Sequence, residues 1–305
     1  WLAIIKNTTG AVEKWYWIDS LNGVTKYLSS DSSATQTTDS NVMTVSGNQF
    51  TLGSTLGAKN YLVEIHKAGL ASAAASNEDG SINTTATSFN ATSGFTMGVY
   101  EGTGANATIG TGLSTAVEFL AVKNNDAGEP WRNWHKDLPD GTYYLKFDNT
   151  TAQSVEAATW NSTAPAATVF SVGVAANVNN NSQTITYYGW HGVDGYSSFG
   201  KYTGNNSADG PMINIGGSPN NWFTKRTDSA DTWQLVDVAV PDNDFNIVEE
   251  RLSINATSIA SSTAAMVWDR LSNGWKVRGN DSGFNASGGT YIWWGIKKNG
   301  GGLWA

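Results

Sequence analysis

The stretch EFLAVKNNDAGEPW, residues 118–131, decides the fold: it reads as a short apolar strand, a basic residue, a polar turn and a tryptophan. Two other stretches follow the same order, WLAIIKNTTGAVEKW from residue 1 and WFTKRTDSADTW from residue 222. Each is followed further along by a second apolar strand that closes the pattern. The sequence therefore predicts three copies of one β-rich unit, with the tryptophan of each opening in the core.

A leader pattern precedes the second and third copies. Its skeleton is Gly-x-Tyr-x-Gly, which begins at Gly98 and again at Gly200. The first copy has no such leader, so Trp1 is expected to lie in the middle of a unit whose upstream part is missing. Complete units recur after about 100 residues, a spacing that suits β-sandwiches better than a solenoid of shorter repeats.

Composition agrees with short strands joined by polar turns. The 305 residues include 14 Trp, 11 Tyr and 10 Phe but only 18 Lys plus Arg, and cysteine is absent. The formal charge of −8 and the lack of basic clusters argue against nucleic acid and anionic membranes as partners. No apolar run approaches the roughly 18 residues of a membrane span. We expect an all-β chain with little helix and no membrane insertion.

The expected organisation is a tandem of antiparallel β-sandwiches of the jelly-roll or laminin-G-like kind. Residues 70–93 are small and polar, which is typical of a linker. We therefore divide the chain into the C-terminal part of a first β-sandwich (1–69), a linker or extended crossing (70–93), a second unit (94–195), a third unit (196–298) and a C-terminal tail (299–305).

Several motifs resemble one known family. They are TSGFTMGVYEGTGANATIGTGLS (92–114), WNSTAPAATVFSVG (160–173), GWHGVDGYSSFGKYTGNNSADGP (189–211) and NASGGTYIWWGI (285–296). Together they resemble a domain of unknown function that is repeated in tail and fibre proteins of marine bacteriophages. The resemblance implies laminin-G-like β-sandwiches and a structural role at the virion surface. It brings no catalytic set, and Thr111 stands where related sequences tend to have a histidine.

An enzyme is not expected. A glycosidase or depolymerase would need two carboxylates roughly 5–10 Å apart in a cleft. Asp19 and Asp237 each follow the tryptophan of their copy by four residues, and Asp137 follows by six, which indicates a recurring turn or strand end. The copies share no second acid beside this position. We therefore assign no catalytic residue.

A sugar-binding site is the main alternative function that composition suggests. Aromatic faces stack on pyranose rings while polar groups take the hydroxyls. The densest candidate is EPWRNWHKD, residues 129–137, where Trp134 and His135 have no equivalents in the other copies and are free to be exposed. We predict Trp134 and His135 as glycan contacts, with Arg132 and Asp137 as hydrogen-bonding partners.

No metal ligand set or cofactor is expected. His66 and His191 occupy one column of the aligned copies, but Lys297 occupies it in the third copy, so both histidines are interpreted as surface residues at strand ends. Asp242 and Asp244 have the spacing of a calcium loop, but the glycine and glutamate of an EF-hand are missing. Ca²⁺ is left as an alternative to an ordinary turn.

The paired tryptophans Trp293 and Trp294 raise a choice between ligand platform and core. Neighbours in a strand point to opposite faces, so only one of the two can face any ligand. Aligned columns stay apolar in all three copies, which favours a buried strand with one face available for an interface. The aligned residues are Tyr187 and Tyr188 in the second copy and Leu62 and Val63 in the first.

These observations predict a structural component of a bacteriophage virion. A tail fibre or appendage that presents β-domains to the host surface is the expected role. The expected partners are other copies of the chain, in a homotrimer, and other virion proteins, with a host glycan as an additional ligand. The alternatives are a glycan-binding module and a capsid-decorating protein, and a depolymerase is the least favoured.

Overall fold

The computed structural model describes residues 1–305 except 48, 70–75, 241–242, 244–245 and 299–305. The described residues form twenty-four strands and three helices of four residues each, so the all-β prediction with little helix is confirmed. All ladders between named strands are antiparallel. Alternation of apolar and polar residues, frequent glycine turns and scarce proline account for this architecture.

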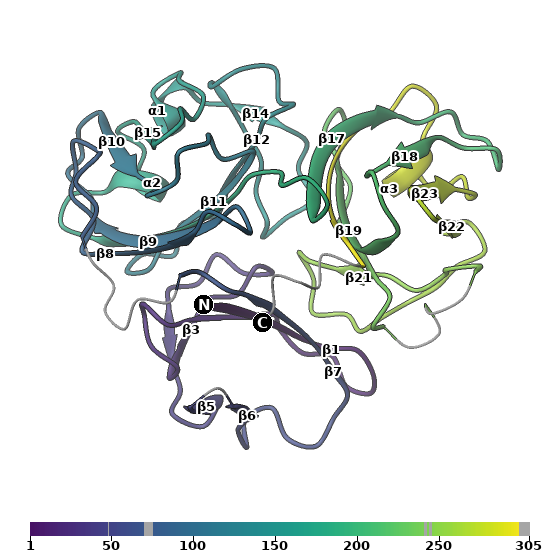
Figure 1. Cartoon of the computed structure of the whole chain (residues 1–305), viewed down its shortest axis with the longest axis horizontal. Helices are drawn as coiled ribbons and strands as arrows, with labels where there is room; N and C mark the ends of the chain where they lie inside the picture. The colour runs from purple at the N-terminus through teal and green to yellow at the C-terminus, as the bar shows by residue number, and fades with distance from the viewer. Residues whose placement is uncertain (48, 70–75, 241–242, 244–245, 299–305) are drawn as a thin grey trace.

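The chain folds into three lobes around a common centre (Figure 1). Lobe 1 comprises β1 to β7, lobe 2 comprises β8 to β16 with α1 and α2, and lobe 3 comprises β17 to β24 with α3. The elements are β1 (Leu2–Asn7), β2 (Tyr16–Asp19), β3 (Lys26–Tyr27), β4 (Thr37–Thr38), β5 (Met43–Ser46), β6 (Gln49–Leu52), β7 (Tyr61–His66), β8 (Ala86–Asn90), β9 (Phe95–Glu101), β10 (Ala107–Gly110), β11 (Phe119–Asn124), β12 (Arg132–His135), β13 (Tyr143–Tyr144), β14 (Ser154–Val155), α1 (Ala157–Trp160), β15 (Val169–Val172), α2 (Ala176–Asn179), β16 (Thr184–Trp190), β17 (Ser197–Thr203), β18 (Met212–Asn214), β19 (Pro219–Arg226), β20 (Trp233–Asp237), β21 (Leu252–Ser253), β22 (Trp268–Leu271), β23 (Gly274–Val277), α3 (Ser282–Asn285) and β24 (Thr290–Lys297).

The same three-stranded arrangement recurs in the main sheet of each lobe. The strand orders are β2-β1-β7, β12-β11-β16 and β20-β19-β24. The register also agrees, because Lys6, Lys123 and Lys225 hold the same place in the middle strand. They pair with Leu62, Thr186 and Ile292 respectively. The three openings of the sequence therefore occupy equivalent positions in three sheets.

Lobes 2 and 3 carry one more strand beside this arrangement. β9 pairs with β16, and β17 pairs with β24. These are the two leader segments, and their glycines lie opposite large rings: Gly98 opposes Tyr187, and Gly200 opposes Trp293. In lobe 1, no described strand pairs with the corresponding edge of β7.

Gly98→Ala is expected to lower the free energy of unfolding by about 1–3 kcal/mol, because it overpacks a buried contact. A Cβ at Gly98 would lie 2.3 Å from the Tyr187 ring, which is fully buried and cannot move away. Urea unfolding measures the difference. Gly128→Ala is the control, since its nearest non-neighbouring atom is 3.9 Å away. Equal stabilities for the two variants would contradict the close packing of leader and sheet.

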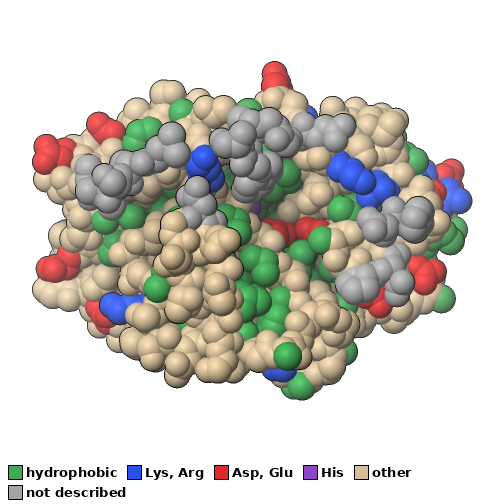
Figure 2. Space-filling model, turned by 60° about the horizontal axis from the view of Figure 1, so that its bottom comes forward, with side chains coloured by type: hydrophobic (Ala, Val, Ile, Leu, Met, Phe, Trp, Pro, Cys, Tyr) green, Lys and Arg blue, Asp and Glu red, His purple; other side chains and the backbone are tan. Residues whose placement is uncertain are grey.

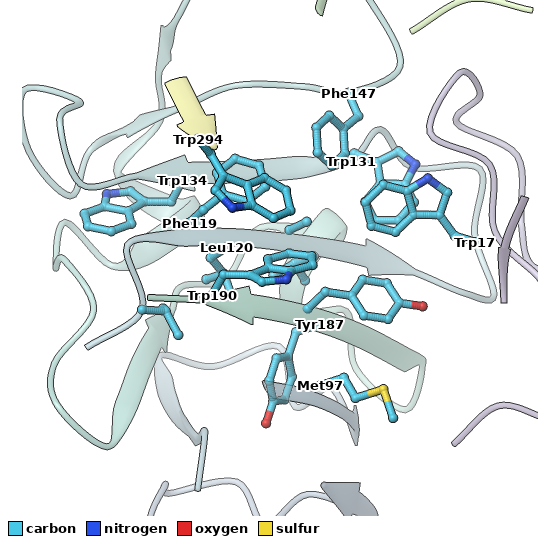
Figure 3. Packing of buried hydrophobic residues seen from close by; sticks show 14 of the residues in the cluster. Trp17, Met97, Phe119, Leu120, Trp131, Trp134, Phe147, Tyr187, Trp190 and Trp294 are labelled. Atoms are coloured by element: carbon cyan, nitrogen blue, oxygen red, sulfur yellow. The ribbon is translucent and has the colours of Figure 1, made fainter. Parts of the chain in front are cut away.

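An aromatic core fills the centre, between the lobes. Figure 3 shows Trp17 from lobe 1, Trp131 and Phe147 from lobe 2, and Trp294 from lobe 3 in one cluster. The Trp17 and Trp131 ring centroids are 5.4 Å apart. Such aromatic pairs stabilise a core beyond the area that they bury. Lobes 1 and 3 also have apolar clusters of their own.

Indole hydrogen bonds link the lobes in a cycle. The ring nitrogen of each opening tryptophan donates to a backbone carbonyl of the preceding lobe, so lobe 1 bonds to 3, lobe 2 to 1 and lobe 3 to 2. The donors and acceptors are Trp15 and Ser253 at 2.9 Å, Trp131 and Ser29 at 2.8 Å, and Trp233 and Lys146 at 2.6 Å. All three tryptophans are buried, as the sequence predicts.

Three buried lysines form hydrogen bonds between the same pairs of lobes. Each ammonium donates to backbone carbonyls of its own turn and of the preceding lobe. Burial lowers the pKa of each lysine to about 8, which reflects the cost of removing the charge from water. The contacts across lobes are Lys6 to Thr257 at 2.9 Å, Lys123 to Ser33 at 3.1 Å and Lys225 to Thr150 at 3.3 Å.

The paired tryptophans of β24 lie in core positions. Trp293 is 8% exposed and belongs to the lobe 3 cluster, while Trp294 is 4% exposed and belongs to the central core. The face expected to form an interface therefore meets the other lobes of the same chain. The alignment of the first copy is wrong by one residue, because the register places Val63 and Glu64 in these columns.

Residues 70–93, expected as a linker or an extended crossing, are described from residue 76 onward. Within them, β8 pairs with β9 at the edge of the lobe 2 sheet. Ile82 forms an isolated bridge with Ile109. This part of the chain therefore contributes an edge strand to the sheet of lobe 2.

Candidate functional site

The four residues predicted to contact a glycan lie on or just after β12, largely buried. Arg132 and Trp134 are each 6% exposed, His135 is 1% exposed, and the Asp137 side chain is 22% exposed. Trp134 belongs to the central core, so its ring faces are covered by protein. The Arg132 guanidinium lies 4.3 Å from the centre of the Tyr144 ring. The structure leaves no open aromatic face at Trp134 for a sugar.

His135 and Asp137 are close to each other, on the side that faces lobe 3. The backbone N–H of Asp137 donates to His135 Nδ1 at 3.1 Å, so His135 Nε2 carries the proton and donates to the Trp293 carbonyl at 3.1 Å. Burial lowers the pKa of His135 to about 4, which keeps the ring neutral at pH 7. This histidine therefore joins two lobes.

The position of His135 recurs at the other two junctions between lobes. The register makes Asp19 and Asp237 its equivalents, and Asp137 lies two residues beyond. Asp19 Oδ2 accepts a hydrogen bond of 2.7 Å from the hydroxyl of Tyr188. The third junction, between lobes 3 and 1, differs because Asp237 faces another acid, Glu64.

Glu64 and Asp237 form a buried carboxyl pair. The two carboxyl groups line the same cleft and repel each other, and Asn221 Nδ2 donates to Glu64 Oε1 at 3.2 Å. Glu64 Oε2 is buried and has no hydrogen-bond partner among the described residues. The backbone N–H of Ala239 donates to Asp237 Oδ1 at 2.7 Å. Burial raises the pKa of Glu64 to about 7, and burial together with repulsion by Glu64 raises the pKa of Asp237. Among the described residues, neither acid forms an ion pair with lysine or arginine.

His66 completes this group. It is 3% exposed, which corrects its interpretation as a surface residue, and burial lowers its pKa to about 3. Its Nδ1 accepts from Trp190 Nε1 at 3.3 Å, so Nε2 carries the proton. His66 Nε2 lies 3.7 Å from Glu64 Oε2 and has no hydrogen-bond partner. A buried donor without a partner normally costs stability or serves a ligand.

A cleft of about 360 Å³ opens beside this group, between lobes 1 and 3. Figure 2 shows a hollow in this face of the molecule, with acidic side chains at its bottom and hydrophobic side chains beside them. The cleft can take a polar or cationic ligand, because its floor has acceptor oxygens and an unpaired N–H. It is lined by residues 62–66, Asn220, Asn221, Asp237, Ala239 and residues 296–298.

Comparison with known proteins identifies a family. The model of a domain of unknown function, DUF7483, matches residues 2–299. The chain belongs to the DUF7483 family. No curated protein and no solved structure matches it.

The described part of this DUF7483 chain has no group of three or more His, Cys, Asp or Glu side chains placed to hold a metal ion. Asp242 and Asp244, the residues of the calcium alternative, lie outside the described residues. No helix there is long and apolar enough to cross a membrane.

The stability that the DUF7483 carboxyl pair contributes is expected to fall as pH rises. The folded-state pKa of Glu64 is raised, so the folded chain holds a proton that the unfolded chain releases between about pH 4.5 and 7. The difference in unfolding free energy between wild type and Glu64→Gln should therefore fall over this range by about 1–3 kcal/mol.

Urea unfolding at four pH values from 4.5 to 7.5 measures this difference. The lowered pKa of His135 makes stability rise with pH, but it does so in both proteins and cancels in the comparison. His66 lies 3.7 Å from Glu64, so its contribution belongs to the difference that is measured. Glu101→Gln, at an exposed strand end, is the control and should follow wild type. Parallel curves for wild type and Glu64→Gln would contradict the raised pKa.

The sequence did not reveal this group because its members come from different lobes. Asp237 occupies a recurring position, but its partner acid lies in another copy. Glu64 lies more than 170 residues away in the chain, as its numbering shows. A correct alignment of the three copies would have indicated it. That alignment places Glu64 at the position that Tyr188 and Trp294 occupy in the other copies, where an acid in the core is unexpected.

Proposed function

We propose that the chain is a structural component of a bacteriophage virion, displayed at the particle surface as part of a tail fibre or appendage. The observation that carries this proposal is the cycle of contacts between lobes. A shared aromatic core and matched tryptophan and lysine hydrogen bonds join the three lobes into one rigid block, which suits a part of an assembly that must resist mechanical force. The resemblance of the quoted motifs to phage tail and fibre domains supports the virion as that assembly.

The contacts of the carboxyl pair give no support to a depolymerase. A glycosidase needs two carboxyl groups that are free to act on a sugar or water between them. Glu64 and Asp237 are instead buried, and they accept hydrogen bonds from Asn221 and from the backbone N–H of Ala239. Burial of Trp134 likewise gives no support to the glycan-binding alternative.

Packing of the lobes against one another accounts for the large number of aromatic residues. Most of the large aromatics are buried within the chain, so their number does not argue for a subunit interface. A homotrimer, the state common among fibres, is therefore proposed from the function alone. Sedimentation of the purified chain at several concentrations tests it, and a stable monomer at all concentrations would reject it.

Locating the chain on the particle tests the proposed function. Antibodies raised against the chain and coupled to gold are applied to purified particles of the phage that encodes it, and viewed by electron microscopy. Label on fibres or other tail appendages is expected. Label on the capsid would favour the decorating alternative, and absence of the chain from the particles, checked by mass spectrometry, would reject a virion role.

A further inference from the structure

The edge of β7 that points away from β1 differs from its counterparts in the other lobes. β16 is covered by β9 along seven residue pairs, and β24 is covered by β17 along seven. β7 pairs with β1 alone among the described strands. Two of three equivalent strand edges are thus occupied by a leader strand, and no strand of the described residues occupies the third.

Peptide groups on this edge have no backbone partner among the described residues. The Asn60 carbonyl accepts from the N–H of Thr8, and bonded and non-bonded pairs alternate along an antiparallel ladder. The peptide groups of Tyr61, Val63 and Ile65 therefore face away from β1. An unpaired edge of this kind is a template for strand addition.

The exposure of a side chain on this edge also indicates that no described strand lies beside β7. Val63 is 39% exposed, whereas its counterparts Tyr187 and Trp293 are 0% and 8% exposed beneath their leader strands. Those large rings require the glycines Gly98 and Gly200 opposite them. Val63 is smaller and leaves room for a residue with a side chain.

The cleft described above runs along this edge. Five consecutive residues of β7, from 62 to 66, line it, and lobe 3 forms its other wall. A segment added to β7 would therefore lie in the cleft, with its outer side against lobe 3. The unpaired Nε2–H of His66 lies in the same lining.

The acids in the cleft indicate which residue type the added segment would carry. Residues directly opposite each other in an antiparallel pair share a face of the sheet. In lobes 2 and 3 the counterparts of Glu64 face Met97 and Phe199, both buried towards the centre. The corresponding residue of an added strand would lie beside Glu64 and Asp237. These acids form no ion pair with any described lysine or arginine, and this includes Lys297 and Lys298 on the opposite wall of the cleft. A lysine or arginine fits that position.

We propose that this cleft binds an extended strand from a partner polypeptide, antiparallel to β7, with a lysine or arginine opposite Glu64. The ladder supplies affinity that does not depend on sequence, and the carboxyl pair selects the basic residue. The inference stands apart from the proposed virion role, because it follows from the edge, the cleft and the charges of the chain itself.

Synthetic peptides test the proposal on the purified full chain. The probe is YSSFGKYTG, residues 196–204 of lobe 3, whose register places Phe199 opposite the counterpart of Glu64. Peptides with Phe199→Lys and Phe199→Glu are compared by fluorescence anisotropy at pH 7.5 and low salt. The lysine peptide is expected to bind at least about tenfold more tightly than the glutamate peptide, since close charge pairs set specificity.

Variants of the chain distinguish the contribution of the carboxyl pair to peptide binding from that of the backbone hydrogen bonds to β7. Glu64→Gln combined with Asp237→Asn should abolish the preference for the lysine peptide. Val63→Pro should lower the affinity for every peptide at least about tenfold, because proline removes an edge N–H without breaking the ladder to β1. Val63→Thr keeps that N–H and is the matched control. Circular dichroism and urea unfolding verify that each variant is folded.

Four results would overturn the proposal. The first is no binding of the lysine peptide, and the second is equal affinity for the lysine and glutamate peptides. The third is dimerisation of the chain that Val63→Pro abolishes, which would assign the edge to a second copy. The fourth is peptide binding only by a variant that ends at Lys298, which would assign the cleft to the chain's own last residues.

Discussion

Replacing Trp294 with alanine is expected to lower the free energy of unfolding by about 3–5 kcal/mol, the range for large aromatic residues in cores. The side chain is 4% exposed and lies where the three lobes meet. Its ring stacks on Phe223 with centroids 4.5 Å apart, and it lies 5.0 Å from Trp190 and 5.9 Å from His66. The lost volume cannot be refilled, because rings from all three lobes surround it.

Equilibrium unfolding in urea, followed by tryptophan fluorescence and circular dichroism, measures the change. Trp294→Phe keeps a ring in the cluster and should lower the free energy of unfolding clearly less than Trp294→Ala. Val12→Ala is the surface control, because Val12 is 68% exposed, and its effect should stay within about 0.5 kcal/mol. A loss below about 1 kcal/mol for Trp294→Ala would show that the lobes do not depend on the central core.

Lys123→Met is expected to lower the free energy of unfolding by about 2–4 kcal/mol, since it leaves buried carbonyls without a donor. The Lys123 ammonium donates to the carbonyls of Asn124 at 2.8 Å and Ser33 at 3.1 Å, in two lobes. Methionine has a similar length but no donor. Lys201→Met, at an exposed position of β17, is the matched control and should be almost neutral.

The pH dependence distinguishes a lost ammonium from simple repacking. The pKa of Lys123 is lowered to about 8 in the folded chain, so between pH 8 and about 10.4 the unfolded chain holds more protons. Stability contributed by this group therefore rises with pH across that window. Lys123→Met should show a smaller rise than wild type between pH 8 and 9.5. Equal slopes in wild type and variant would contradict the buried charge.

Local sequence patterns predicted the strands and the core tryptophans. The opening pattern was sufficient because apolar alternation and a polar turn specify a hairpin without help from the rest of the chain. Trp15, Trp131 and Trp233 could be assigned to the core for the same reason. The leader glycines were visible as a skeleton, although their role opposite large rings needed the register.

Contacts between lobes could not be predicted from such patterns. The cyclic bonds use backbone carbonyls, which carry no sequence signature, and Glu64 meets Asp237 only after the lobes close. Trp134 and His135 were expected to be exposed because the other copies have no equivalents. Their burial follows from neighbours in other strands and lobes, which local composition does not report.

The cyclic bonds also make the lobes depend on one another. Each described lobe donates to the one before it, and lobe 1 donates to lobe 3, so every lobe supplies one donor and one acceptor to its neighbours. Deleting one lobe would leave one indole without its acceptor and one carbonyl without its donor. A change that displaces one lobe is therefore felt at two junctions at once.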